Sequence, residues 1–384
     1  AAAIKIDSRK IKDFFKRADI FLLAVCMICT IFGIVMIYSM TSSYGWAKYV
    51  VVQGFAMFLG IGAFVVFTVI DPDLIADKWV YLTIFNVLFI VGLIFFGKGD
   101  EVGSRAWYRF AGIGVQPSEI VKVIFIVLIA KQMATYKEQR TLNKFPSVLK
   151  LGIHWALYFG LITVIPNDLG SALIFLAIFV VMLICAGIAW YWMAAAAAVV
   201  AAMIPLFWNF FLADYQKNRI LAPYIPDVVD PTGQGITWQM NLCKDALASG
   251  RWTGVGFGEG SFSQSSYNAR HTDCVFASIG EELGMVACIA IIVLLSIIII
   301  RCCIIGVRSG SPFGMLICFG VATALAFQTF INIGMCIGIT PVIGITLPFF
   351  SYGGSSVVAM YAAVGLVSGV KYRPKPRQNF LQYQ

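Results

Sequence analysis

Long apolar runs recur through most of this 384-residue sequence and leave few choices of fold. Most runs are about 20 residues long, the length that an α-helix needs to cross the hydrocarbon core of a bilayer. Only helices and closed barrels satisfy all their backbone hydrogen bonds inside a membrane. Hydrophobic residues make up 60% of the chain and charged residues only 12%, about half the share found in soluble domains. The sequence therefore predicts an all-α polytopic membrane protein.

The breaks between the runs predict about ten transmembrane helices. We place them at about 18–40, 46–70, 78–97 and 117–133, two within 151–187, and then 189–212, 276–305, 313–336 and 355–370. The run 151–187 is too long for one helix, and Pro166-Asn167-Asp168-Leu169-Gly170 supplies the turn of a hairpin. The predicted organisation is a cytoplasmic N-terminal segment 1–17, helices one to seven within 18–212, one large extracytoplasmic loop 213–275, helices eight to ten within 276–370, and a cytoplasmic tail 371–384.

Basic residues indicate how these helices are oriented. Eighteen of the 28 Lys and Arg residues fall on the side that would hold both termini if ten helices cross the membrane. Cytoplasmic loops carry such an excess of basic residues, so both termini are predicted to be cytoplasmic. The polar segments 98–116, 213–275 and 338–354 and the hairpin turn then share the outer face. The net charge of +9 is explained by this asymmetry and by anionic headgroups, and we predict no nucleic-acid partner.

Cysteines and histidines restrict the possible chemistry. Eight of the ten cysteines lie inside apolar runs, where Cys behaves as a small hydrophobic residue. Only Cys243 and Cys274 lie in polar or boundary sequence, which leaves a disulfide between them open. Because His154 and His271 are the only histidines, a multi-histidine metal site is excluded.

The segment 268–284 places ionisable residues directly before the strongly apolar run 285–300. These residues are Arg270, His271, Asp273, Glu281 and Glu282. A charge carried to the bilayer centre costs roughly 2.5–3.5 kcal/mol, so such residues are more often functional than incidental. Two simpler interpretations stay open: Thr272 or Asp273 caps the following helix, or the two glutamates lie at the headgroup level and are satisfied by water.

Further polar residues on the predicted outer face are candidates for an anion site. They are Arg105, Trp107, Arg109, Glu119, Lys122, Asp168, Lys217 and Arg219. Glu119 and Lys122 share one side of a helix, either as an internal ion pair or as part of a site. Arg105 and Arg109 flank Trp107, either as a membrane-interface anchor or as a phosphate site. Asp168 can equally stabilise its own turn.

A carboxylate next to several cations suits transfer from a phosphate-linked donor. The cations would hold the leaving diphosphate, and the carboxylate would deprotonate the acceptor. The residues therefore predict a polar, phosphate-binding outer site with one candidate base.

Short motifs carry a family resemblance along nearly the whole chain. They are Gly103-Ser104-Arg105-Ala106-Trp107, Gln116-Pro117-Ser118-Glu119, Pro166-Asn167-Asp168-Leu169-Gly170, Tyr215-Gln216-Lys217-Asn218-Arg219, His271-Thr272-Asp273, Gly280-Glu281-Glu282-Leu283-Gly284, and Ser351-Tyr352-Gly353-Gly354. In these blocks and their order the sequence resembles the SEDS family, the RodA, FtsW and SpoVE proteins of bacterial cell-wall synthesis, and most of all its RodA branch. It departs from the family at 268–270 and 274, where the family usually has Pro-Glu and Phe.

The resemblance implies a peptidoglycan glycosyltransferase that polymerises lipid II on the outer face of the bacterial cytoplasmic membrane. Lipid II is the undecaprenyl-diphosphate-linked disaccharide-pentapeptide. By the same resemblance Asp273 is the catalytic base. Together with the anion-site candidates, the predicted substrate-binding residues are Arg105, Trp107, Arg109, Glu119, Lys122, Asp168, Lys217, Arg219 and His271. The resemblance also implies a class B penicillin-binding protein as partner. It leaves room for a divalent cation, Mg²⁺ or Mn²⁺, although no motif resembles a dedicated metal cage.

Two other functions remain open at this point. Intramembrane Glu119, Lys122 and Asp168 with broken helices also suit a lipid II flippase or transporter, which would need access from both faces. A scaffold that only recruits a penicillin-binding protein would tolerate replacement of Asp273. The choice among elongation, division and sporulation also stays open.

Overall fold

The computed structural model describes residues 8–42, 45–97, 105–110, 113–212, 214–265 and 267–373. Nine helices in these ranges are long and apolar enough to cross a membrane. They are α2 (Ile20–Thr41), α3 (Trp46–Val69), α5 and α6 together (Trp79–Phe96), α8 (Phe145–Val164), α9 (Leu169–Ala186), α10 with most of η1 (Trp190–Phe210), α14 (Val275–Arg308), α15 (Pro312–Ile337) and α16 (Gly354–Tyr372). The predicted all-α polytopic membrane protein is confirmed.

Helix α7 (Pro117–Glu138) completes the predicted set of about ten long helices. It is 22 residues long, but it carries Glu119, Lys122 and Lys131 among its apolar residues. Both Glu119 and Lys122 are buried, so the helix hides these charges inside the protein. The remaining elements are α1 (Ser8–Arg17), α4 (Pro72–Ala76), β1 (Tyr108–Phe110), β2 (Ile113–Val115), α11 (Asp214–Leu221), α12 (Pro226–Val229), α13 (Trp238–Gly250) and η2 (Asn268–His271).

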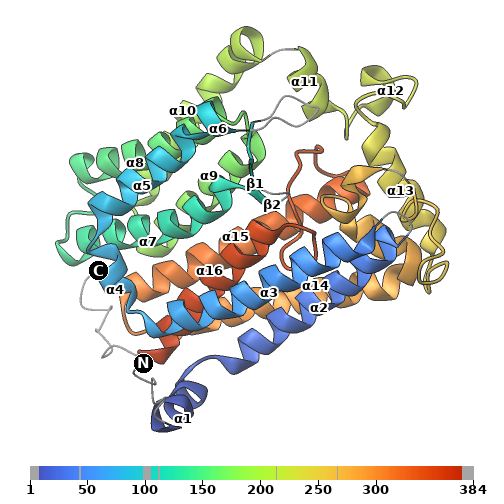
Figure 1. Cartoon of the computed structure of the whole chain (residues 1–384). Coiled ribbons are helices and arrows are strands. Elements are labelled where there is room, and N and C mark those ends of the chain that lie inside the picture. Colours follow the sequence, from blue (N-terminus) through green and yellow to red (C-terminus); the bar gives the residue numbers. More distant parts are fainter. Residues whose placement is uncertain are drawn as a thin grey trace.

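The segment predicted as one large loop contains regular structure. Helices α11, α12 and α13 and the short helix η2 all lie in it, and Figure 1 shows the first three at the edge of the helix bundle. Which side of a membrane this segment faces stays a prediction.

Asp19 connects three helices, α2, α14 and α16, at one end of the bundle. It caps α2 by accepting a hydrogen bond from the Leu22 N–H at 3.0 Å. Its buried carboxylate also pairs with Arg301 of α14 at 2.8 Å and with Lys371 of α16 at 3.2 Å. The start of α2 and the ends of α14 and α16 therefore meet there, away from α13 (Figure 1).

Glycines bring α3 and α16 close together at the centre of the bundle. A Cβ atom on Gly365 would lie 2.8 Å from the backbone of Phe64, and one on Gly60 would lie 2.7 Å from the Tyr361 ring. Small residues at such contacts are how helices pack inside membranes, where burial of apolar surface gives little driving force.

Helix α14 is broken at Gly284, although the sequence predicts one helix over about 276–305. Gly284 has φ 78°, a backbone region that favours glycine. The segment 251–256 docks into the break: the N–H groups of Met285 and Val286 donate to the carbonyls of residues 251 and 252 at 2.9 and 3.3 Å. In return, the N–H groups of residues 255 and 256 donate to the carbonyls of 281 and 282 at 2.9 and 3.1 Å. The break is possible because other parts of the protein satisfy the freed backbone groups.

Glu281 and Glu282 hold this docked segment in place. Glu281 accepts hydrogen bonds from backbone and hydroxyl groups of residues 261–263 at 2.9–3.1 Å. Glu282 accepts them from the Ser39 hydroxyl at 2.6 Å and the Gly258 N–H at 3.1 Å. Both glutamates are at most 1% exposed. The interpretation that water satisfies them at the headgroup level is therefore wrong.

Candidate functional site

Asp273 lies in the short turn between η2 and α14. The N-cap position of α14 is Cys274, and no side chain caps the helix from that position. Thr272 instead donates its hydroxyl to the carbonyl of Ala269 at 3.3 Å. Neither Thr272 nor Asp273 occupies this N-cap position. The Asp273 side chain is partly exposed, as a group that meets a substrate must be.

Three successive carbonyls fix the backbone of this turn. The carbonyl of His271 accepts from the Tyr352 N–H at 2.8 Å, and that of Thr272 accepts from the Ser351 hydroxyl at 2.6 Å. The carbonyl of Asp273 accepts from the Asn332 side-chain amide at 2.7 Å. The same amide nitrogen donates to the Ile345 carbonyl at 2.7 Å. Asn332 therefore joins the Asp273 turn to the non-helical segment 338–353.

The segment 338–353 also brings Arg219 to the same region. Arg219 donates its Nε–H to the carbonyl of Val342, two residues before Gly344. A Cβ atom on Gly344, which has φ 70°, would lie 3.5 Å from the Asp273 carboxylate. Arg219 and Asp273 thus lie against neighbouring residues of the segment 338–353, although 54 positions separate them in the sequence.

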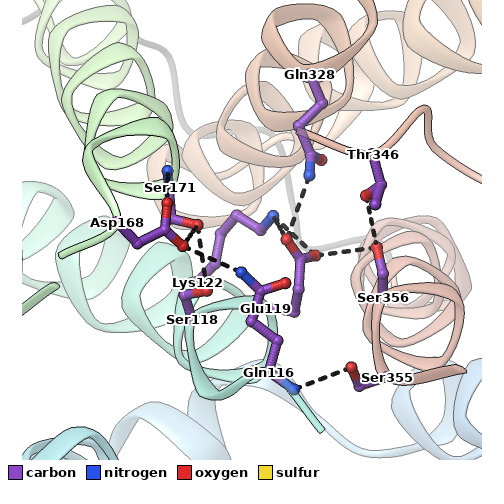
Figure 2. A network of polar contacts seen from close by, with 10 residues as sticks. All are labelled: Gln116, Ser118, Glu119, Lys122, Asp168, Ser171, Gln328, Thr346, Ser355 and Ser356. Carbon is purple, nitrogen blue, oxygen red and sulfur yellow. Dashed lines mark hydrogen bonds and ion pairs between the residues drawn. The ribbon is translucent and has the colours of Figure 1, made fainter. Parts of the chain in front are cut away.

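Figure 2 shows a network of polar contacts that includes Thr346 of this segment. Lys122 donates to both carboxylate oxygens of Glu119 at 3.0 Å. Ser356 and Gln328 also donate to Glu119, at 3.3 and 3.4 Å, and the hydroxyls of Ser356 and Thr346 lie 3.4 Å apart. Of the two interpretations of Glu119 and Lys122, the structure forms the internal ion pair. Through Thr346 the pair is connected to the segment beside Asp273.

Asp168 belongs to the same network and caps α9. Its carboxylate accepts from the Ser171 N–H at 2.9 Å, the Ser171 hydroxyl at 2.6 Å and the Gln116 amide at 3.1 Å (Figure 2). Next to it, a Cβ atom on Gly170 would lie 2.8 Å from the carbonyl of Ile343. Asp168 therefore stabilises its own turn, and that turn packs against the segment 338–353.

His271 is a buried histidine whose ring packs against two tyrosines. Its ring centroid lies 5.0 Å from that of Tyr49 and 5.5 Å from that of Tyr352. Its Nδ1 atom is buried and has no hydrogen-bond partner among the described residues. Burial, together with the charge of Arg270, lowers the pKa of His271 to about 4. The imidazole is therefore neutral at pH 7.

The depressed pKa of His271 predicts a loss of stability in acid. An unfolded histidine takes up its proton near pH 6.5, whereas folded His271 does so near pH 4, so the unfolded chain binds more protons between these values. The free energy of unfolding should fall by up to about 3 kcal/mol as pH falls through this window. Thermal unfolding of the native chain and of His271→Gln at pH 7, 5.5 and 4 checks this. Equal acid sensitivity of the two chains would contradict it.

The remaining predicted site residues lie on two outlying elements. One element is the β1–β2 hairpin with the residues just before it, which carry Arg105, Trp107 and Arg109. Arg105 and Arg109 are exposed, and Trp107 packs on Gly114. Lys217 of α11 pairs with exposed Asp214 at 3.4 Å. The hairpin is continuous with the network, because the N–H of Gln116 donates to the Ser355 hydroxyl at 3.1 Å.

Asn332 is the site residue that sequence reasoning missed. Its side chain is fully buried in the C-terminal part of α15, between apolar neighbours. An amide in such a position is itself a signal, because polar side chains inside membrane helices are retained for a packing or functional reason. Its two acceptors, however, are carbonyls from different segments, which the sequence does not reveal.

The described residues of this region contain neither a cluster of metal-ligating side chains nor a disulfide. In the part of the chain that the structure describes, no group of three or more His, Cys, Asp or Glu side chains could hold a metal ion. Because Mg²⁺ is usually held by only one or two carboxylates together with substrate phosphates, a divalent cation stays a prediction from the family resemblance. Cys243 and Cys274, the pair left open by the sequence, are both buried free thiols.

Comparisons with known proteins agree on one family. Residues 19–375 match the family described as Cell cycle protein, FTSW_RODA_SPOVE. The probable peptidoglycan glycosyltransferase FtsW of Geobacter metallireducens is 31% identical over 372 residues, which cover 94% of this chain and 96% of the relative. The peptidoglycan glycosyltransferase MrdB of Escherichia coli K12 is 32% identical over 318 residues, covering 81% of this chain and 82% of the relative.

Solved structures have the same fold. A chain from a peptidoglycan synthase complex, described as coordinating polymerization and crosslinking, aligns with a TM-score of 0.77 at 25% identity, covering 92% of this chain and 97% of that chain. The rod shape determining protein RodA of Thermus thermophilus aligns with a TM-score of 0.68 at 22% identity, covering 92% of this chain and 96% of that chain. The resemblance found in the sequence motifs is thereby confirmed, and the chain belongs to the FtsW/RodA/SpoVE family.

Proposed function

We propose that this chain is a peptidoglycan glycosyltransferase that polymerises lipid II into glycan strands. Its relatives FtsW and MrdB are named for this activity. The observation that carries the assignment of the site is the fixed position of Asp273. Three successive carbonyls of its turn are hydrogen-bonded to α15 and the segment 338–353, while the residue itself stays partly exposed.

In the proposed reaction Asp273 takes the proton of the acceptor sugar hydroxyl. The resulting oxygen attacks the anomeric carbon of the donor with inversion, and the bond to the diphosphate breaks as undecaprenyl diphosphate leaves. Arg219 uses Nε–H for the Val342 carbonyl and Nη1 for the Tyr215 hydroxyl at 2.9 Å. Because a guanidinium has five N–H donors, others remain for the leaving diphosphate. His271 belongs to the same turn, and because its imidazole is neutral it adds no charge next to the base.

The buried network supports this site from behind. Glu119, Lys122 and Asp168 all pair with protein groups, so we assign them to holding the segment 338–353. Arg105, Trp107, Arg109 and Lys217 lie on exposed or half-exposed elements and remain proposed contacts to lipid II.

The setting of the reaction is also proposed. We place the chain in the bacterial cytoplasmic membrane, with both termini cytoplasmic and the Asp273 turn on the outer face. The excess of basic residues on the side of the termini supports this orientation. A class B penicillin-binding protein is the proposed partner, supported by the likeness to a peptidoglycan synthase complex.

The test is synthesis of glycan from labelled lipid II by the purified chain together with a class B penicillin-binding protein. Long glycan strands on a gel are expected. The same preparation in vesicles distinguishes the alternative: if labelled lipid II crosses the membrane and no glycan forms, the chain is a transporter and this proposal fails.

The Asn332 amide predicts a rate effect at a distance from the substrate. In Asn332→Asp, carboxylate oxygens would face two carbonyl oxygens, so both hydrogen bonds are lost and the Asp273 turn shifts. We expect kcat to fall by about 10²-fold with a smaller change in KM, because a displaced base misaligns the reaction more than it weakens binding. Asn209→Asp makes the same change at an exposed position and should keep the native kcat. A rise in KM with kcat unchanged would show that Asn332 does not position the base.

A further inference from the structure

A cavity of about 780 Å³ lies beside α13, and no function has yet been given to it. Its walls come from α13, from residues 261, 262, 265 and 267, and from Glu281 of α14. The side chains that bear on its chemistry are Trp238, Asp245, Ser249, Ser261, Ser265 and Tyr267. We call it the α13 cavity. Its size falls within the roughly 300–1,000 Å³ typical of small-molecule sites.

The composition of the α13 cavity excludes an anionic ligand. None of its described lining residues is basic, while Asp245 and Glu281 add two carboxylates. A diphosphate needs Arg, Lys or a cluster of backbone N–H groups. The diphosphate of a lipid-linked donor therefore belongs near Arg219, and this cavity suits a neutral part of the substrate.

Two aromatic rings give the cavity a rigid apolar wall. The rings of Trp238 and Tyr267 meet edge to face with their centroids 5.1 Å apart, and Trp238 keeps 37% of its surface exposed. The flat C–H face of a pyranose ring is apolar and packs on such a surface, as apolar groups pack on aromatic side chains elsewhere.

Oxygen acceptors surround these rings. The hydroxyls of Ser249 and Ser265 donate to the carbonyls of residues 246 and 262 at 2.8 and 2.7 Å, which leaves them lone pairs for sugar hydroxyls. The Asp245 carboxylate is exposed. Glu281, by contrast, is saturated by residues 261–263 and fixes the wall. An apolar platform with acceptors around it matches a polyhydroxylated ring.

The α13 cavity is next to the Asp273 turn. Gln239, which follows Trp238, donates its amide to the Cys274 sulfur at 3.2 Å, and Cys274 follows Asp273 directly. On the other wall, Tyr267 immediately precedes η2, and its backbone carbonyl accepts from Arg270 at 2.7 Å. A ligand in the cavity would therefore lie close to the proposed base.

We propose that the α13 cavity binds uncharged sugar rings of the glycan strand, with Trp238 as the stacking platform. This inference rests on the proposed polymerase function, because only a polymerase keeps further sugar rings next to the bond being formed. The cavity would hold the strand in place between additions and so favour long products.

Calorimetric titration of the full-length chain in detergent tests this proposal. The probe is an uncharged β-1,4-linked tetramer of N-acetylglucosamine. We expect saturable binding that weakens about tenfold in Trp238→Leu, which corresponds to about 1.4 kcal/mol, the upper end of the range for aromatic contacts. Trp238→Phe keeps a ring and should bind nearly as well as the native chain, which excludes misfolding as the cause. Trp252→Leu removes a tryptophan that is 69% exposed and does not line the cavity, and should bind normally.

The outcomes separate this inference from the polymerase proposal. Absence of tetramer binding, or equal affinities of Trp238→Leu and Trp252→Leu, would overturn the α13 cavity as a sugar site, even if the chain makes glycan. Binding that is unchanged in Asp273→Asn but weakened about tenfold in Trp238→Leu would support it independently of catalysis. Binding of a lysine-containing stem peptide in place of the tetramer would assign the cavity to an amine and contradict the proposal.

Discussion

Asp273→Asn is expected to lower the initial rate of glycan synthesis by about 10²–10⁴-fold, the contribution typical of a positioned general base. Asparagine has nearly the same shape as aspartate but cannot take the proton of the acceptor hydroxyl. The hydrogen bonds that hold the turn use backbone carbonyls, so they survive the change. The measurement is the rate of polymer formation from labelled lipid II at saturating substrate.

The matched control is Asp227→Asn. It makes the same change at an exposed residue of α12, within the same segment between η1 and η2, and should keep the native rate. If Asp273→Asn polymerised lipid II as fast as the native chain, Asp273 would not be the base. If a variant that makes no glycan kept full biological activity, the chain would act as a non-enzymatic scaffold that only recruits a penicillin-binding protein.

Lys122→Met is expected to destabilise the protein by about 3–5 kcal/mol. The substitution removes one partner of a buried ion pair and leaves the Glu119 charge uncompensated, which costs more than the pair itself contributes. Glu119 is only 4% exposed, so water cannot replace the lost ammonium group. Denaturation of the purified protein in detergent measures the change in unfolding free energy.

Two further variants make the Lys122 prediction specific. Lys131→Met lies on the same helix, but Lys131 is 35% exposed where it pairs with Asp73, so a loss below about 1 kcal/mol is expected. The double variant Lys122→Met/Glu119→Gln removes both charges and should recover at least half of the lost stability. If the effects of Lys122→Met and Glu119→Gln simply added, the ion pair would not be the source of the loss.

Hydropathy located the membrane helices because the bilayer demands a run of apolar residues of nearly fixed length. It was less accurate at helix ends: α7 extends to Glu138 and α8 begins at Phe145, beyond the predicted ends at about 133 and 151. The backbone hydrogen bonds of a helix can continue beyond its apolar residues, and hydropathy cannot locate the end of the helix there. The break at Gly284 was missed because a single glycine in an apolar run also fits a continuous helix. Only the docked segment 251–256 makes the break stable.

The sequence identified individual residues of the candidate site but not how they are arranged in space. Asp273 stands out as a carboxylate before an apolar run, and Glu119 and Lys122 by their spacing. The spacing could not decide between an ion pair and a substrate contact, since both need the same two side chains on one helix face. The role of the segment 338–353 was hidden, because it contributes mainly backbone carbonyls, and every residue carries one.

The hydrogen bonds of the Asp273 turn also determine when a newly made chain acquires its site. Asn332 follows Asp273 by 59 positions, and Ser351 follows Thr272 by 79. Synthesis proceeds from the N-terminal end, so the aspartate enters the membrane region well before the groups that fix it. A nascent chain that stops after α14 would carry the carboxylate on an unsupported turn. If Asp273 is the base, activity therefore requires α15 and the segment 338–353 to be in place, and a chain that stops before them would not consume lipid II.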